Sequence, residues 1–147
     1  MKKNQYNKIV IITDLGDFMK NYSRQREAIL TALRSTKTHP TASMIYETVR
    51  KELPNISLGT VYRNLSALSK AGEILCVDVG DGFEHYDGDI SSHAHLYCKK
   101  CQNLTDAPLE SGYLREVTDK YGFSPETASC VVYGVCKNCL KNEIGGN

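Results

Sequence analysis

Two Cys-x-x-Cys pairs constrain the fold of this chain more than any other feature of its sequence. Residues 102–135 separate the first pair, Cys98 and Cys101, from the second pair, Cys136 and Cys139. Two thiolates from each tight turn can complete a tetrahedral zinc site, and the four sulfurs leave no ligand position for a substrate. The predicted ion is therefore structural, and it would fasten the C-terminal end of the chain to the segment near residue 98.

Redox-active dithiols are the alternative interpretation of such pairs. The sequence contains no apolar stretch long enough to span a membrane and no signal-peptide pattern, so we expect a cytoplasmic protein without a membrane partner. Thiols stay reduced in that compartment, which favours metal binding over disulfide formation. The two remaining cysteines, Cys76 and Cys130, lie among apolar residues and are predicted to be buried.

The first half of the chain predicts three helices. Ser23, Thr41 and Ser57 stand where each could cap a helix, and His39-Pro40 separates the first helix from the second. Helical spacing indicates that the third helix turns one apolar face inward. That face consists of Val61, Leu65 and Leu68.

Short strands dominate the remainder of the sequence. Strands over 74–79 and 83–86 are predicted around the turn Gly80-Asp81-Gly82, and three helices followed by a hairpin are the pattern of a winged helix-turn-helix. The later segments predicted are strands over 94–98 and 103–106, a helix over 109–121 and a strand over 128–136. We therefore expect an α+β chain in which a winged helix-turn-helix precedes a small α/β module with the four-cysteine zinc site.

An excess of basic residues in the first half suggests a nucleic-acid partner. Between residues 20 and 70 the sequence has nine Lys or Arg and three Glu. A solvated helical surface is the alternative explanation of such an excess. The third predicted helix adds side chains suited to DNA, because Arg and Asn can pair with guanine and adenine edges in the major groove. We expect its outer faces to carry Thr60, Tyr62, Arg63, Asn64 and Ser66.

The histidines indicate a second metal with different chemistry. His93 and His95 are two residues apart, so on a strand both imidazoles would lie on the same face. Nearby carboxylates could complete a site of nitrogen and oxygen ligands, which suits Fe(II), Mn(II), Zn(II) or Co(II). The pattern does not decide between His39 and His85 as a further ligand. The carboxylates are those of Asp87, Asp89 and Asp106.

These motifs together resemble the ferric uptake regulator (Fur) superfamily, and most closely its peroxide-responsive, PerR-type branch. The resemblance extends from about residue 22 to residue 141. The matching segments are Ser23-Arg24-Gln25-Arg26, His39-Pro40-Thr41-Ala42, residues 57–65, residues 93–101 and residues 133–139.

The resemblance implies a homodimer that represses transcription by binding a double-stranded DNA operator. The winged-helix domain would span 1–88, the linker 89–92, and the α/β dimerisation and metal-binding domain 93–147. Structural zinc would lie on the four paired cysteines. The implied DNA contacts are Arg24, Arg26, Ser57, Thr60, Tyr62, Arg63 and Asn64.

The resemblance also implies a regulatory Fe(II) or Mn(II) site, and it selects His39 over His85. With Fe(II), hydrogen peroxide would oxidise the imidazoles of His39 and His93, and the repressor would release metal and DNA. With Mn(II), the same site would repress but resist peroxide. Aspartate at 106 is typical of the peroxide branch, whereas iron-uptake regulators typically have glutamate there. The implied ligands are His39, Asp87, His93, His95 and Asp106.

The sequence departs from the peroxide branch at three places. Arg24 stands where the branch commonly has Pro, and residues 7–20 are a weak version of the family's first helix. Arg63 is more usual among iron-uptake members, so an iron-sensing Fur-type repressor of metal-uptake genes is the alternative function. A zinc-stabilised interaction module without DNA binding is another. We do not expect an enzyme, because no nucleophile–base pair or cofactor loop accompanies the histidines.

Overall fold

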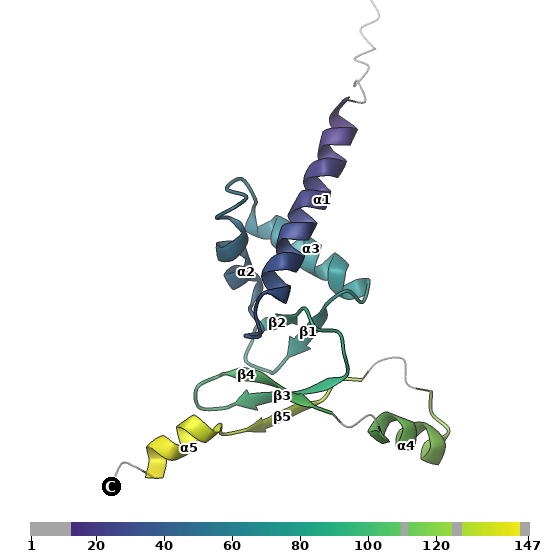
Figure 1. The fold of residues 1–147 in the computed structure, drawn as a ribbon, viewed down its shortest axis with the longest axis vertical. Coiled ribbons are helices and arrows are strands. Elements are labelled where there is room, and N and C mark those ends of the chain that lie inside the picture. The colour runs from purple at the N-terminus through teal and green to yellow at the C-terminus, as the bar shows by residue number, and fades with distance from the viewer. Residues whose placement is uncertain (1–12, 110–111, 125–127, 145–147) are drawn as a thin grey trace, which may run out of the picture.

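Three helices and a β-hairpin lie above a three-stranded sheet that carries a helix at each end (Figure 1). The structure is a computed structural model that describes residues 13–109, 112–124 and 128–144. None of its described helices is both long and apolar enough to cross a membrane. The elements are α1 (Thr13–Arg34), α2 (Ala42–Val49), α3 (Leu58–Lys70), β1 (Leu75–Asp78), β2 (Glu84–Asp87), β3 (His93–Cys98), β4 (Leu104–Pro108), α4 (Gly112–Tyr121), β5 (Val131–Gly134) and α5 (Lys137–Ile144).

The three N-terminal helices share one apolar core. Apolar residues recur at helical spacing on α1, α2 and α3, and burying those faces against one another stabilises the helices. Ser57 caps α3 as expected, since its Oγ accepts a hydrogen bond of 3.1 Å from the Thr60 N–H. Such a cap contributes about 1 kcal/mol. The core side chains with at most 1% exposure are Ile29, Leu33, Ile45, Val61, Leu65, Leu68 and Ile74.

Two expectations about helix starts are wrong in detail. Ser23 is not a cap, because α1 is already helical at Thr13 and continues through Ser23 to Arg34. No proline interrupts residues 13–22, and the single Gly16 costs about 1 kcal/mol, which is too little to end a helix. Thr41 does stand at the N-cap of α2, but its side chain makes no capping hydrogen bond.

The hairpin connects the helical core to the lower sheet. β1 and β2 pair antiparallel, and β3 lies centrally between antiparallel β4 and parallel β5. Val77 and Val79 pack with Tyr97 and Leu104 in a second small core, whereas Tyr86 belongs to the helical core. One face of the hairpin therefore packs into the helical core, and the other packs into the small core beside the lower sheet.

Three further expectations are corrected by the structure. Cys76 is exposed and Cys130 is half-buried, so neither is a core residue. Cys76 pairs in register with Tyr86, but the Tyr86 ring occupies the core and leaves Cys76 beside an open groove. Strand β5 is shorter than the predicted 128–136, and helix α5 was not anticipated.

Candidate functional site

Five predicted ligand residues come together between the helical half and the sheet. His39 lies in the turn between α1 and α2, Asp87 ends β2, His93 and His95 lie on β3, and Asp106 lies on β4. One ligand atom from each lies within 4.8 Å of all the others. His95 and Asp106 are register partners in the antiparallel β3–β4 pair, so strand pairing alone places these two together.

The distances between these atoms match those between the ligands of one ion. Two ligands about 2.1 Å from an ion and at right angles stand about 3 Å apart. His93 Nε2 lies 3.0 Å from His95 Nε2 and 2.9 Å from Asp87 Oδ2. His39 Nε2 lies 3.3 Å from Asp87 Oδ2 and 2.7 Å from Asp106 Oδ1. All three imidazoles therefore direct Nε2 toward the same small volume.

Unsatisfied polar atoms support the fit to a metal. His39 Nε2 and Asp106 Oδ1 are buried, and within the described residues neither makes a hydrogen bond despite their 2.7 Å separation. The contact is short enough for a hydrogen bond but wrongly directed for one. Buried nitrogen and oxygen atoms without partners are costly, and a divalent cation would satisfy them together. The donor set of three imidazoles and two carboxylates suits Fe(II) or Mn(II).

Electrostatics prepares two of these groups for metal binding. Burial raises the pKa of Asp87, but the His39 imidazole 3.3 Å away and the hydrogen bond from the Asp89 N–H outweigh burial and hold that pKa well below its usual range. Burial lowers the pKa of His95. Asp87 is therefore an anion and His95 a neutral imidazole near neutral pH, which are the forms that bind metal. Burial also opposes protonation of His39, but the Asp87 and Asp106 carboxylates raise its pKa overall.

The site opens to solvent mainly along Asp106. The His39, Asp87, His93 and His95 side chains are 1%, 8%, 7% and 4% exposed, whereas that of Asp106 is 29% exposed. A cavity of about 320 Å³ borders Asp87 and Asp106. Asp89 borders the same cavity but is not part of the cluster, and its carboxylate accepts a hydrogen bond from the Ser91 N–H.

The four paired cysteines form a separate cluster at the far end of the lower sheet. Their sulfurs lie within 4.8 Å of one another. Cys101 Sγ and Cys136 Sγ are 3.7 Å apart, and ligands about 2.3 Å from a tetrahedral zinc would stand about 3.8 Å apart. Backbone N–H groups of Cys101 and Cys136 lower the pKa of Cys98 to about 6, which favours the thiolate that zinc binds. Hydrogen bonding to the Cys136 and Cys101 sulfurs raises the pKa of Cys139 to about 12, because it favours the protonated thiol.

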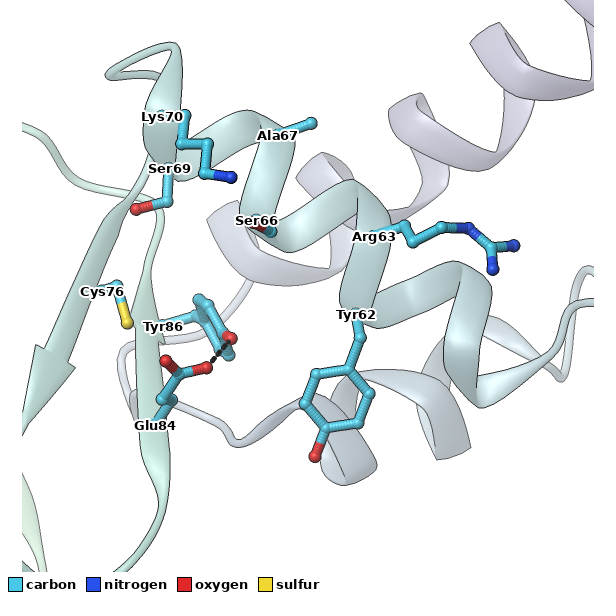
Figure 2. Close-up of a pocket in the computed structure, with 9 residues that line it drawn as sticks. All are labelled: Tyr62, Arg63, Ser66, Ala67, Ser69, Lys70, Cys76, Glu84 and Tyr86. Atoms are coloured by element: carbon cyan, nitrogen blue, oxygen red, sulfur yellow. Dashed lines mark hydrogen bonds between the residues drawn. The ribbon is translucent and has the colours of Figure 1, made fainter.

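The outer surface of α3 carries some, but not all, of the side chains expected there. Tyr62 and Arg63 are exposed, and in Figure 2 the Arg63 guanidinium extends away from the hairpin. Arg63 Nη2 donates a hydrogen bond of 3.0 Å to Thr60 Oγ1. The expectation for Asn64 is wrong, because it is 2% exposed and donates from Nδ2 to the Thr60 carbonyl. Position 64 lies three residues after Val61, on the stripe that helical spacing turns inward.

Two arginines of α1 that were expected to contact DNA also differ in their surroundings. Arg24 is exposed, whereas Arg26 forms an ion pair with Glu73, just beyond the end of α3. Between α3 and the hairpin lies a groove of about 570 Å³, in which the Tyr86 hydroxyl donates a hydrogen bond of 2.6 Å to Glu84 (Figure 2). The groove forms where α3, β1 and β2 pack together, so no local sequence pattern predicts it.

Two residues that the sequence did not assign also border the metal cluster. His85 is not in the cluster, and its ring contacts the His39 backbone instead. Gly88 follows Asp87, and a Cβ atom there would lie 3.1–3.3 Å from the Cγ, N and Cα atoms of Arg34. A side chain at position 88 would therefore crowd the contact between the β2 end and α1. Neither role has a local sequence signal, because each depends on a contact distant along the chain.

Comparison with known proteins agrees with this arrangement. The model of the Ferric uptake regulator family matches residues 19–133. The peroxide-responsive repressor PerR of Staphylococcus aureus strain USA300 is 34% identical over 117 residues, covering 78% of this chain and 79% of that protein. The Campylobacter jejuni peroxide stress regulator superposes with a TM-score of 0.78 at 28% identity, covering 89% of this chain and all of that one. The Helicobacter pylori ferric uptake regulator shares the fold, with a TM-score of 0.69, 22% identity and coverage of 95% and 97%. The chain belongs to the Ferric uptake regulator family.

Proposed function

We propose that this protein is a metal-dependent transcriptional repressor that responds to hydrogen peroxide. The observation that carries the proposal is the convergence of His39, from the helical half, with four ligand residues of the hairpin and sheet. The likeness to PerR of S. aureus and to the C. jejuni peroxide stress regulator supports the same function.

The helical half is proposed to be a winged helix-turn-helix within residues 1–88, with 89–92 as linker. Helix α3 would enter the major groove and the β1–β2 hairpin would be the wing. Arg63 and Tyr62 are exposed on α3 and suited to base and phosphate contacts. Arg26 and Asn64 would stabilise the helical half instead of contacting DNA, since each already bonds to a partner within the protein. The proposed DNA contacts are Arg24, Ser57, Thr60, Tyr62 and Arg63.

The domain over residues 93–147 is proposed to form a homodimer and to hold structural zinc on its four paired cysteines. Leu96 and Val132 are register partners on β3 and β5, so they share one face of the sheet. They are 41% and 50% exposed. Apolar side chains gathered on one sheet face are typical of an interface, and a second copy would cover them. A two-fold dimer would present two α3 helices to a symmetric operator.

Metal binding would control the relative position of the two halves. Of the five ligand residues, only His39 lies outside the hairpin and sheet. Without the ion, His39 Nε2 and Asp106 Oδ1 are buried without hydrogen-bond partners, which favours separation of the His39 segment from the sheet. An ion that binds only the closed arrangement shifts the population toward it, and we propose that this arrangement binds DNA.

His39 and His93 are proposed to be the oxidation-sensitive residues. Fe(II) at this site would supply the redox chemistry that activates hydrogen peroxide, with no net electron taken from the ion, whereas Mn(II) would bind without supplying that chemistry. One imidazole carbon would gain an oxygen atom from peroxide, and the second peroxide oxygen would leave as water. The modified ring is a weaker metal ligand, so the His39 segment would separate from the sheet and the affinity for DNA would fall.

The proposal is tested with protein that is purified without oxygen, loaded with Fe(II) or Mn(II), and treated with hydrogen peroxide. Operator binding and the masses of the peptides that contain His39 and His93 are then measured. We expect a gain of one oxygen and a loss of DNA binding with Fe(II) only. DNA binding that survives peroxide with Fe(II) would instead indicate an iron-sensing repressor, which Arg63 favours. Protein that binds no operator with either metal would contradict both functions.

A further inference from the structure

His85 lies on β2, two residues before the ligand Asp87, and contacts two oxygen atoms. Its Nδ1 lies 3.0 Å from the His39 carbonyl oxygen, and its Nε2 lies 2.9 Å from Asp81 Oδ2. Its side chain is only 12% exposed. Both neighbours are oxygen atoms on opposite sides of the ring, one from the His39 backbone and one from the Asp81 side chain. His85 thereby connects the hairpin turn to the backbone of a metal ligand.

The backbone of His39 needs such support. Its φ angle is 51°, in the left-handed region that residues other than glycine seldom adopt. Conformations of this kind persist only where surrounding contacts enforce them, and they cluster at functional sites. The Tyr86 N–H donates to the Pro40 carbonyl at 3.0 Å, and Thr41 forms a single β-bridge with His85. The segment that carries His39 is therefore held along β2.

Asp81 sets the orientation of the His85 ring from the other side. It lies in the turn between β1 and β2, where Gly80 and Gly82 have φ angles of 77° and 89°. Asp81 Oδ1 accepts a hydrogen bond of 3.0 Å from the Phe83 N–H, which leaves Oδ2 directed at His85. The turn thus has a fixed carboxylate on the side that faces the His39 segment.

We infer that His85 is a positioning residue for the regulatory metal. It fixes the carbonyl of His39, and thereby the backbone from which the His39 imidazole reaches Asp87 and Asp106. This inference rests on the proposed function of the five-residue site. It also implies that the hairpin turn and the metal site are coupled. If the conformation of the turn affects metal affinity through His85, then metal binding must equally affect the conformation of the turn.

The test compares the Mn(II) affinity of three variants with that of the wild-type protein. His85→Leu removes both hydrogen bonds at similar volume, and His85→Asn keeps an amide nitrogen near the position of Nδ1. Tyr86→Phe is the matched control, because it removes the Glu84 hydrogen bond of the adjacent residue and leaves the His39 segment alone. We expect Mn(II) affinity to fall about tenfold in His85→Leu, the loss typical of an outer-shell partner. His85→Asn should recover most of it, and Tyr86→Phe should bind as the wild type does.

Operator affinity at saturating Mn(II) distinguishes a positioning role of His85 from a general loss of folding. At saturating Mn(II), operator affinity of His85→Leu should return to the wild-type value, because the ion restores the closed arrangement. Zinc content should be unchanged. If His85→Leu does not fold, Asp81→Ala should give a smaller loss of Mn(II) affinity by releasing the His85 ring. Variants at both positions that bind Mn(II) like the wild type would overturn the inference. A wild-type protein that binds no Mn(II) would overturn the proposed function instead.

Discussion

The two ligand clusters of this molecule differ in where their residues originate. The four cysteines come from one end of a single sheet: Cys98 ends β3, its register partner is Gly134 of β5, and Cys136 follows two residues later. The histidine and aspartate cluster draws on the turn before α2, the hairpin and the lower sheet. The first cluster is confined to one module, whereas the second connects two.

This difference predicts different consequences of metal binding. An ion held within one sheet end stabilises that module and leaves the position of the helices unchanged. An ion held between His39 and the sheet would change the relative position of the two halves. The sulfur cluster is therefore suited to structure and the nitrogen and oxygen cluster to regulation, which is a claim that variants of each cluster can separate.

Cys136→Ser should have the largest effect, because loss of one thiolate leaves an incomplete zinc site. Structural zinc contributes about 10 kcal/mol or more to small domains, and a loss of even several kcal/mol lowers the Tm by more than about 10 °C in a chain of this size. Zinc content by mass spectrometry and a thermal melt would measure both. Cys130→Ser is the control, since Cys130 lies just before β5 but outside the cluster. A Cys136→Ser protein that keeps its melting temperature would contradict a structural role.

His39→Ala should have the next largest effect, on regulation alone. Removal of the ligand from the helical half should lower Mn(II) affinity by more than the roughly 10- to 100-fold lost with an outer-shell partner. Operator affinity should then no longer respond to Mn(II), while zinc content stays at the wild-type value. Asp89→Asn is the matched control, because Asp89 borders the same cavity without belonging to the cluster. Loss of zinc from His39→Ala would show that the two clusters are not independent.

The same contrast explains how much of each site the sequence could predict. Spacing within the chain predicted the cysteine pairs, and strand alternation predicted that His93 and His95 share a face, which their 3.0 Å contact confirms. Neither pattern could choose His39 over His85, because His39 reaches the cluster through pairing of its segment with β2. Only the family resemblance made that choice, and the geometry agrees with it.

The fold shows the same limit of local patterns. Helical spacing predicted the inward face of α3, but the polar identity of Asn64 suggested an outward position that spacing contradicted. Ser23 carried a helix-start signal that has no effect inside a continuous α1. Local patterns identified the elements, whereas their ends and the residues between the two halves depend on contacts distant along the chain.

Gly88→Ala should affect the regulatory cluster by a smaller amount than loss of a ligand. The added Cβ would meet backbone atoms of Arg34 at 3.2–3.3 Å, which cannot move aside as a side chain would. Overpacking of this kind destabilises by about 1–3 kcal/mol. The displaced β2 end should misplace Asp87 and weaken Mn(II) binding about tenfold. Gly112→Ala is the control, because a Cβ there meets no atom within 4 Å. Equal Mn(II) affinities of the two variants would show that the approach of β2 to α1 does not position Asp87.

Asp106→Glu should have the smallest effect on metal binding. Asp106 is the most exposed ligand residue and lies on the edge strand β4, beside the cavity of about 320 Å³, so there is room for an additional methylene group. We expect Mn(II) affinity to change by less than about tenfold, whereas Asp106→Asn should lose more because it removes the negative charge. Isothermal titration with Mn(II) would measure both. Equal losses would mean that the position of the oxygen matters more than its charge. The cysteine cluster offers no comparable tolerance, because four sulfurs of one module must all reach the same ion, whereas a site between two halves can adjust at its exposed edge.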